Sequence, residues 1–317
     1  MKTIKLSTPW NHNYLHQFPS SICEIDEYKF EINNECNVAD FWVIWGGVNS
    51  EEHCTVKSGK VLYITDEAYP ERQFNKQFLK QFDNIIAVRT DLNEKYNVIN
   101  NFEITPWYFN KSYDELNSLK RIHKNKKISI ISSDLTLLSG HKKRFAFVNK
   151  MIGHFKDKVD VFGRGFNEIP DKFDALNNYQ FSIAIENNVL NDYFTEKISE
   201  CFLTYTMPIY FGCPNIEEYY DSKSFIKIDI DNYNEAIHTI ESAMNSNVYD
   251  NSLEYIIDSR NRYLNKYHFA PAIVSIISGV EINPFVKKNR KITIFPETKF
   301  EKTVLIKRAI KQIINNL

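Results

Sequence analysis

The chain has 317 residues, of which 43% are hydrophobic and 25% charged, and its 23 Phe and 18 Tyr can fill large cores. These values exclude bulk disorder, and the length predicts two domains. A formal net charge of −1 excludes a general nucleic-acid binder, so we predict no nucleic-acid partner.

Cysteine usage and the N-terminal sequence predict the compartment. The five cysteines form no C-x-x-C pair and their number is odd, which favours reduced thiols in a cytosolic protein. The first 20 residues lack the apolar run of a signal peptide, and no stretch approaches the roughly 20 apolar residues that cross a bilayer. We therefore expect a soluble, cytoplasmic protein.

Short apolar runs alternate with helical patterns along the chain, as is typical of parallel α/β layers. In the first half, the four-residue spacing of Phe74, Phe78 and Phe82 predicts a helix over 71–82. A second helix is expected to begin at Ser112, because a Glu follows three residues later. The strands predicted in this half are 3–7, 41–45, 61–65 and 85–88.

The polar, basic segment 119–127 marks a predicted domain boundary. We expect domains at 1–122 and 123–285, followed by a tail at 286–317. Two successive α/β units predict two Rossmann-like domains that face each other across a cleft, and in such sheets ligands bind beyond the carboxyl ends of the strands. The elements predicted in the second domain are the strands 128–132, 159–162, 181–185, 208–211 and 225–228 and the helices 143–155, 195–205, 233–245 and 253–267.

The loop 186–197 follows the apolar strand 181–185 and holds the densest group of candidate binding residues. Thr195 is expected to cap the next helix, so Glu196 and Lys197 lie in its first turn. The N–H groups and the partial positive charge of a helix N-terminus attract anions, and Lys197 adds a full charge that can neutralise a diphosphate. The alternative is a structural role, in which Glu196 complements the helix dipole and Lys197 is solvated.

Four short motifs follow one another over 179–229. They are Ile185-Glu186-Asn187, Tyr193-Phe194-Thr195-Glu196-Lys197, Pro208-Ile209-Tyr210-Phe211-Gly212 and Ser224-Phe225-Ile226. Their order and spacing resemble the donor-binding signature of the family-10 α1,3-fucosyltransferases, with Ile185 in place of a Phe of the family.

A weaker resemblance extends upstream. The segment 141–148 is similar to the helix that carries the family's phosphate-binding arginine, which places Arg144 at that position. An ordinary exposed helical arginine is the alternative. The segment 161–167 resembles the family's G-x-G turn. After a predicted strand, Glu67 lies where the family has its catalytic glutamate, although Asp66 replaces a common Gly, and a turn or cap is the alternative.

The resemblance implies a GT-B-type α/β fold with an N-terminal acceptor domain and a C-terminal donor domain. It also implies an inverting glycosyltransferase that moves L-fucose from GDP-fucose to a hydroxyl of an acceptor glycan, with α1,3 linkage as the family default. Glu67 would remove the acceptor proton, and Glu196 would face donor hydroxyls or the positive charge of the transition state. The donor-binding residues would be Arg144, Glu186, Asn187, Tyr193, Thr195 and Lys197, some of which meet the charge of the leaving diphosphate.

Two alternatives to fucosyl transfer stay open. The same fold and mechanism can serve another nucleotide-sugar donor, and a non-catalytic glycan- or nucleotide-binding protein can use the same scaffold. Asp229 and Asp231 form a D-x-D sequence, but its place after a late strand favours a turn over a metal site. We predict no metal ligands and no required cofactor besides the donor substrate GDP-fucose, with a divalent metal left open as a stimulator.

The tail at 286–317 carries nine basic and two acidic residues, a net charge of +7. Within it, 302–317 is expected to form an amphipathic helix with Ile306, Ile310, Ile313 and Leu317 on one stripe. This helix could lie on an anionic membrane surface, at the inner membrane and near lipid-linked or O-antigen glycans, or it could pack on the N-terminal domain. Nucleic-acid binding by the tail is a third alternative. The acceptor is left open between oligosaccharides and lipid-linked glycans.

Overall fold

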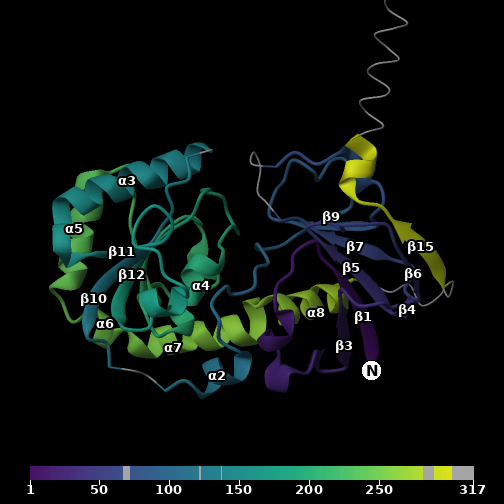
Figure 1. Cartoon of the computed structure of the whole chain (residues 1–317), viewed down its shortest axis with the longest axis horizontal. Helices are drawn as coiled ribbons and strands as arrows, with labels where there is room; N and C mark the ends of the chain where they lie inside the picture. The colour runs from purple at the N-terminus through teal and green to yellow at the C-terminus, as the bar shows by residue number, and fades with distance from the viewer. Residues whose placement is uncertain (67–71, 121–122, 137, 281–288, 302–317) are drawn as a thin grey trace, which may run out of the picture. The chain divides into compact units, whose positions relative to one another are not determined.

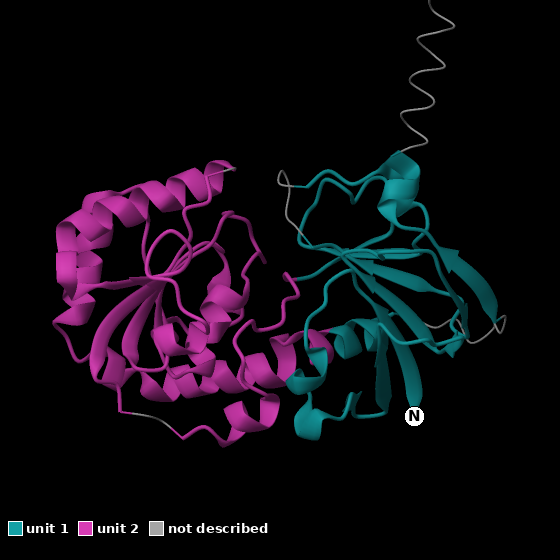
Figure 2. Ribbon diagram, viewed as in Figure 1, with its two compact units in different colours: residues 1–101, 273–317 teal, residues 102–272 magenta. Residues whose placement is uncertain are grey.

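The computed structural model describes residues 1–66, 72–120, 123–136, 138–280 and 289–301. The chain divides into two compact units, one formed by residues 1–101 with 273–317 and the other by 102–272 (Figure 2). Each unit has a parallel sheet and a hydrophobic core of its own.

The main sheet of the first unit has seven strands within the described residues, in the order β2-β3-β1-β5-β7-β8-β9 (Figure 1). Every pair is parallel except β2 with β3. β5 is buried along its whole length, as expected for a central parallel strand covered on both faces. The strands are β1 (Lys2–Ser7), β2 (Glu24–Ile25), β3 (Tyr28–Ile32), β5 (Phe41–Trp45), β7 (Val61–Ile64), β8 (Asn84–Ala87) and β9 (Val98–Asn100).

A second sheet of this unit contains part of the predicted tail. In the described part of the chain it joins β15 (Arg290–Ile294), β6 (Glu52–Val56) and β4 (Val38–Ala39), and β15 runs antiparallel to β6. The tail predicted at 286–317 therefore contributes a strand to the first unit. The helix predicted at 302–317 lies outside the described residues.

The helix predicted at 71–82 is wrong in its extent, because the described residues form only α1 (Lys76–Leu79) there. Asn75 caps α1 with its side chain, and its own N–H donates to Glu297 Oε1 (2.6 Å) instead of to a helical carbonyl. Phe74, which precedes the cap, packs against the core of the unit outside the helix. The other helices of this unit are η1 (Tyr14–Gln17), η2 (Pro19–Ser21) and part of α8 (Phe269–Gly279).

The second unit has a five-stranded parallel sheet in its described residues, in the order β11-β10-β12-β13-β14. Figure 1 shows α3 and α5 on one side of this sheet and α6 and α7 on the other. The strands are β10 (Lys126–Ile131), β11 (Asp160–Phe162), β12 (Tyr179–Ile185), β13 (Met207–Phe211) and β14 (Ile226–Lys227). The α-helices are α2 (Tyr113–Ser118), α3 (Ser139–Phe155), α4 (Glu196–Leu203), α5 (Tyr233–Met244), α6 (Val248–Asn251) and α7 (Leu253–Arg262). Shorter turns are η3 (Lys156–Lys158), η4 (Lys172–Ala175), η5 (Ile216–Glu218), η6 (Ser222–Ser224) and the π-helical η7 (Tyr263–Tyr267).

The predicted α/β class with two Rossmann-like units is confirmed by the two parallel sheets. The first boundary lies at 101/102, earlier than the predicted 122/123, because Trp107 and Leu116 are buried in the core of the second unit. The predicted helix start at Ser112 is confirmed by a reciprocal capping box with Glu115.

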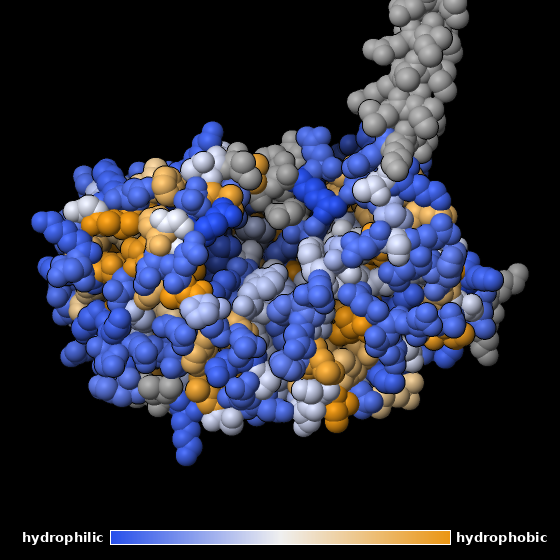
Figure 3. All heavy atoms as spheres, in the orientation of Figure 1, coloured by the Kyte–Doolittle hydropathy of each residue, from blue (hydrophilic) through white to orange (hydrophobic). Residues whose placement is uncertain are grey.

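Hydrophilic residues predominate on the face shown in Figure 3, and hydrophobic residues gather there in small patches. Scattered exposed apolar side chains of this kind are usual on globular proteins. No helix among the described residues is both long enough and apolar enough to cross a bilayer.

Candidate functional site

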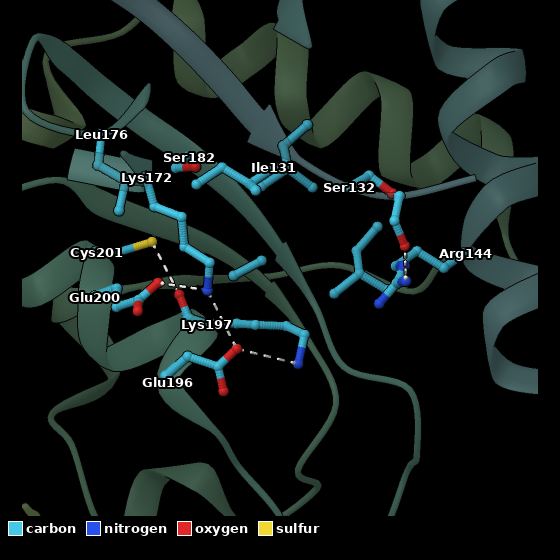
Figure 4. Close-up of a pocket in the computed structure, with 14 residues that line it drawn as sticks. Ile131, Ser132, Arg144, Lys172, Leu176, Ser182, Glu196, Lys197, Glu200 and Cys201 are labelled. Carbon is cyan, nitrogen blue, oxygen red and sulfur yellow. Dashed lines mark hydrogen bonds and ion pairs between the residues drawn. The ribbon is translucent and has the colours of Figure 1, made fainter. Parts of the chain in front are cut away.

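A pocket of about 190 Å³ lies in the second unit, at the carboxyl ends of β10 and β12 (Figure 4). This is the edge at which parallel α/β sheets bind ligands. Ligand pockets commonly enclose roughly 300–1,000 Å³, so a pocket of this size suits one charged or sugar-sized part of a larger ligand. The charged side chains that line it are Arg144, Lys172, Glu196, Lys197 and Glu200.

A buried carboxylate, Glu186, organises the loop that follows β12. It is 2% exposed and accepts hydrogen bonds from Thr195 N (2.8 Å), Thr195 Oγ1 (2.9 Å) and Lys197 Nζ (3.0 Å). Thr195 also caps α4, as predicted. A buried charge needs such partners. The loop is therefore closed on itself, and Lys197 is held with its ammonium group at the pocket.

Arg144 reaches the same loop from α3. Its Nη1 donates to Asn187 Oδ1 (2.5 Å) and its Nη2 to Ser133 Oγ (3.2 Å). The approach is close because Gly140 lies in the first turn of α3 against the loop, where a Cβ atom would lie 1.8 Å from the carbonyl oxygen of Asn187. Arg144, predicted from a separate part of the sequence, thus joins Asn187 and Lys197 of the donor loop in one cluster.

The glycine that ends the motif after β13 also has a physical reason. A Cβ atom on Gly212 would lie 2.5 Å from Cγ of Glu186 and 2.6 Å from the hydroxyl of Tyr210. Only a residue without a side chain lets this strand end pass so close to the buried carboxylate. The spacing of the predicted motifs therefore reflects packing around Glu186.

Lys172 and Glu200 also line the pocket, although neither is among the site residues predicted from the sequence. Lys172 Nζ lies 3.2 Å from Glu200 Oε2 and 3.6 Å from Glu196 Oε1. Figure 4 shows both carboxylates pointing toward this ammonium group. The sequence feature that could have indicated Glu200 is its four-residue spacing from Glu196, which places both side chains on one face of a helix. No local pattern connects them to Lys172.

The charged groups in this cluster shift one another's pKa values. Burial acts to raise the pKa of Glu196, but Lys197 and Lys172 lower it to about 2. Burial raises the pKa of Glu200, and Lys172 offsets part of that rise. Although burial opposes the effect, Glu186 and Glu196 raise the pKa of Lys197. At neutral pH the pocket therefore presents ammonium groups and an ionised Glu196.

Of the other predicted site residues, one does not line the pocket and one lies outside the described residues. Tyr193 is 4% exposed and is not among the residues that line the pocket. Glu67 lies outside the described residues. Its neighbour Asp66 follows β7 in the first unit, and its carboxylate pairs with Arg72.

The D-x-D sequence forms a turn, as predicted, because Asp231 N donates to Asp229 Oδ1 (2.9 Å). Asp231 also pairs with Lys143 of α3. Within the described ranges, no group of three or more His, Cys, Asp or Glu is arranged to hold a metal ion. All five cysteines are free thiols, and Cys201 lines the pocket.

Residues 122–256 match the model of "Glycosyltransferase family 10 (fucosyltransferase) C-term". This range contains the pocket and every predicted site residue except Glu67.

Curated relatives match smaller parts of the chain. Alpha-(1,3)-fucosyltransferase FucT of Helicobacter pylori is 32% identical over 108 residues, which cover 32% of this chain and 22% of that protein. Alpha-(1,3)-fucosyltransferase B of Drosophila melanogaster is 33% identical over 158 residues, which cover 44% of this chain and 34% of that protein. The match thus spans between about a fifth and a third of the length of these relatives.

A solved structure resembles a larger part of the chain. The N-terminal domain of trehalose-6-phosphate phosphatase from Candida albicans superposes with a TM-score of 0.53 at 8% identity, over 88% of this chain and 97% of that one. At this identity the likeness shows the fold alone.

Proposed function

Because residues 122–256 match the model of glycosyltransferase family 10, we propose that this chain belongs to that family and transfers L-fucose from GDP-fucose to a hydroxyl of an acceptor glycan. The observation that carries the proposal is the meeting of Arg144 and Lys197 in one pocket, beside the N-terminus of α4. A departing nucleoside diphosphate develops negative charge, which fixed cations and a helix N-terminus stabilise.

In this proposal the predicted donor-binding residues divide into two groups. Arg144 and Lys197 contact the diphosphate, and Asn187 and Tyr193 complete the donor site from the same loop. Glu186 and Thr195 are buried and bonded to Lys197, so they hold its ammonium group in place for the donor.

The chemical step is an inverting displacement. The acceptor oxygen attacks the anomeric carbon as the bond to GDP breaks, and its proton passes to Glu67 as general base. Glu196, ionised at neutral pH, faces the donor hydroxyls and the positive charge that develops on the sugar. An α1,3 linkage, an acceptor-binding role for the first unit and a donor-binding role for the second are part of this proposal.

The acceptor and the location belong to the proposal as well. We take the acceptor to be an oligosaccharide or a lipid-linked glycan, such as an O-antigen sugar, met in the cytoplasm at the inner membrane surface. The +7 charge of 286–317 supports a peripheral membrane contact. The proposed mechanism requires no metal, because Arg144 and Lys197 supply the positive charge. A divalent ion could still stimulate the reaction.

The test is calorimetric titration with GDP, UDP and GDP-fucose in the absence of metal, followed by an assay of GDP release with a panel of glycans. Lys197→Ala is the variant. Lys126→Ala is its matched control, because Lys126 pairs with Asp160 (3.0 Å) in the same unit but does not line the pocket.

GDP-selective binding that is lost in Lys197→Ala and kept in Lys126→Ala, together with turnover of GDP-fucose, would support the proposal. A preference for UDP would replace fucose by another donor sugar. Nucleotide binding without turnover of any donor, in wild type and Glu67→Gln alike, would point to a non-catalytic binding protein.

A further inference from the structure

Lys172 is a pocket-lining cation that lies outside the motifs of the donor loop. Its ammonium group lies 3.2 Å from Glu200 Oε2 and 3.6 Å from Glu196 Oε1, so it is shared by two carboxylates of α4. From this geometry we infer that Lys172 is a positioning residue, held in place by Glu200, which keeps the carboxylate of Glu196 ionised and oriented in the pocket. The inference rests on the proposed function, because Glu196 is the residue that faces the donor sugar there.

Hydrogen bonds from one neighbouring segment hold both η4 and Glu200 in place. Asp171 caps η4 by accepting a hydrogen bond from Phe173 N (2.9 Å), and its other oxygen accepts one from Asn110 N (3.0 Å). The same neighbouring segment fixes Glu200, whose Oε1 accepts a hydrogen bond from Tyr108 N (2.7 Å). One stretch of backbone therefore sets the position of η4 and of the Glu200 carboxylate. The backbone of Lys172 is thus anchored next to the Glu200 carboxylate that its ammonium group contacts.

The charged and titratable groups around Glu196 come from three elements. Lys172 approaches from η4, Lys197 and Glu200 from α4, and Tyr263 from η7. Lys197 lies 3.9 Å from Glu196 but is bonded more closely to Glu186, at 3.0 Å. Beyond Lys197, the guanidinium of Arg144 acts on the same ammonium group.

Removing Lys172 would leave two carboxylates, Glu196 and Glu200, one helical turn apart with a single lysine that a third carboxylate already holds. Two close carboxyl groups without a cation share one proton at pH values where each alone would be ionised. A protonated Glu196 could not oppose positive charge on the sugar. Lys172 would thus act on the reaction through Glu196 and without contact with the reacting atoms.

The experiment compares the pH dependence of kcat/KM for GDP-fucose in wild type, Lys172→Met and Lys172→Arg. Lys126→Met is the matched control, since it removes a paired lysine of the same unit that is remote from the pocket. The double variant Lys172→Met/Glu200→Gln removes the competing carboxylate together with the cation. Its purpose is to keep the test valid if Lys172→Met folds poorly.

A second readout does not need turnover. The carboxyl carbon of Glu196, labelled with ¹³C and assigned by its loss in Glu196→Gln, reports ionisation directly through its chemical shift. This titration is performed on the full chain in wild type and in each lysine variant. It separates failure of the inference from failure of the proposed function.

The inference predicts that the acidic limb of the kcat/KM profile and the Glu196 titration both move up by about one pH unit or more in Lys172→Met. Lys172→Arg and Lys126→Met should retain the wild-type values, and the double variant should recover most of the shift. An unchanged Glu196 titration in folded Lys172→Met, or an equal shift in Lys126→Met, would overturn it. If wild type turns over no donor but the titration shifts as expected, the inference stands and the fucosyl-transfer proposal falls.

Discussion

The two units of this chain each carry charged side chains just beyond the carboxyl ends of their parallel strands, but the surroundings of these charges differ. In the first unit, Arg72 pairs with Asp66 and Glu297, and Arg89 pairs with Asp91. In the second, Arg144, Lys172 and Lys197 line a pocket of about 190 Å³.

Arg72 and Arg89 of the first unit lie against the same aromatic ring. The guanidinium carbons of Arg72 and Arg89 lie 4.8 and 5.1 Å from the ring centroid of Phe74. Cations placed over an aromatic face are stabilised without a ligand. Paired charges at a strand end therefore do not by themselves indicate a binding site. In the second unit, Arg144, Lys172 and Lys197 also line a pocket beside the carboxyl ends of the strands.

The two groups of paired charges should differ most in how much they contribute to the free energy of unfolding. Glu186→Ala should lower the free energy of unfolding of the second unit by about 3–5 kcal/mol, because it leaves the Lys197 ammonium group without its buried partner. Glu297→Ala in the first unit should cost only about 1–2 kcal/mol, because Arg72 keeps Asp66. Urea unfolding followed by hydrogen-exchange mass spectrometry resolves the units. An equal or larger loss for Glu297→Ala would break the comparison.

Nucleotide affinity should separate the two networks next. Arg144→Met is expected to weaken GDP binding by roughly 10- to 100-fold, the loss of one charge-assisted contact. Arg72→Met, the same change in the first unit, should leave the dissociation constant within about twofold. Calorimetric titration measures both. Comparable losses in the two variants would mean that the first unit also binds the nucleotide.

The two units should also respond to pH in opposite directions. Lys197 and Lys172 lower the pKa of Glu196 to about 2, against the effect of burial and from an ordinary 4.5, so its contribution to stability is present above pH 4.5 and is lost as pH falls toward 2. Burial raises the pKa of Asp66, and Arg72 offsets only part of this rise. The contribution of Asp66 is therefore greatest at low pH and is lost as pH rises through its folded pKa.

These signs are testable with neutral variants. Glu196→Gln should lower the free energy of unfolding at pH 7 by an amount on the order of 1–3 kcal/mol, and the difference from wild type should shrink at pH 3. The free energy of unfolding of Asp66→Asn, relative to that of wild type, should be higher at pH 7 than at pH 3. Urea unfolding at both pH values provides the data. The same sign for both variants would contradict the assignment.

The smallest expected effect concerns helix caps. Ser112→Ala should cost the second unit about 1 kcal/mol, because Ser112 and Glu115 cap α2 reciprocally. Asn75→Ala should cost the first unit about 0.5 kcal/mol, since Asn75 caps α1 through one side-chain bond. Thermal unfolding of both variants measures the difference. A larger loss at Asn75 would show that its backbone bond to Glu297 depends on the side chain.

Much of the second unit could be predicted because its signals are local. The apolar run of β12, the cap at Thr195 and the first turn of α4 are adjacent in sequence, and the structure places them as expected. The first unit is less predictable from its sequence. The four-residue spacing of aromatic residues predicts a helix that includes Phe74, but the ring of Phe74 packs against the core from outside α1.

Local sequence patterns were enough to predict the class of fold, the two parallel-sheet units and the loop from Glu186 to Lys197, because hydrophobic periodicity and capping act between near neighbours. Tertiary structure alone decided that Arg144 meets Asn187, that Lys172 joins Glu196 and Glu200, and that β15 pairs with β6. These contacts join segments far apart in the chain, and no short-range pattern encodes which distant partner a side chain or a strand edge will meet.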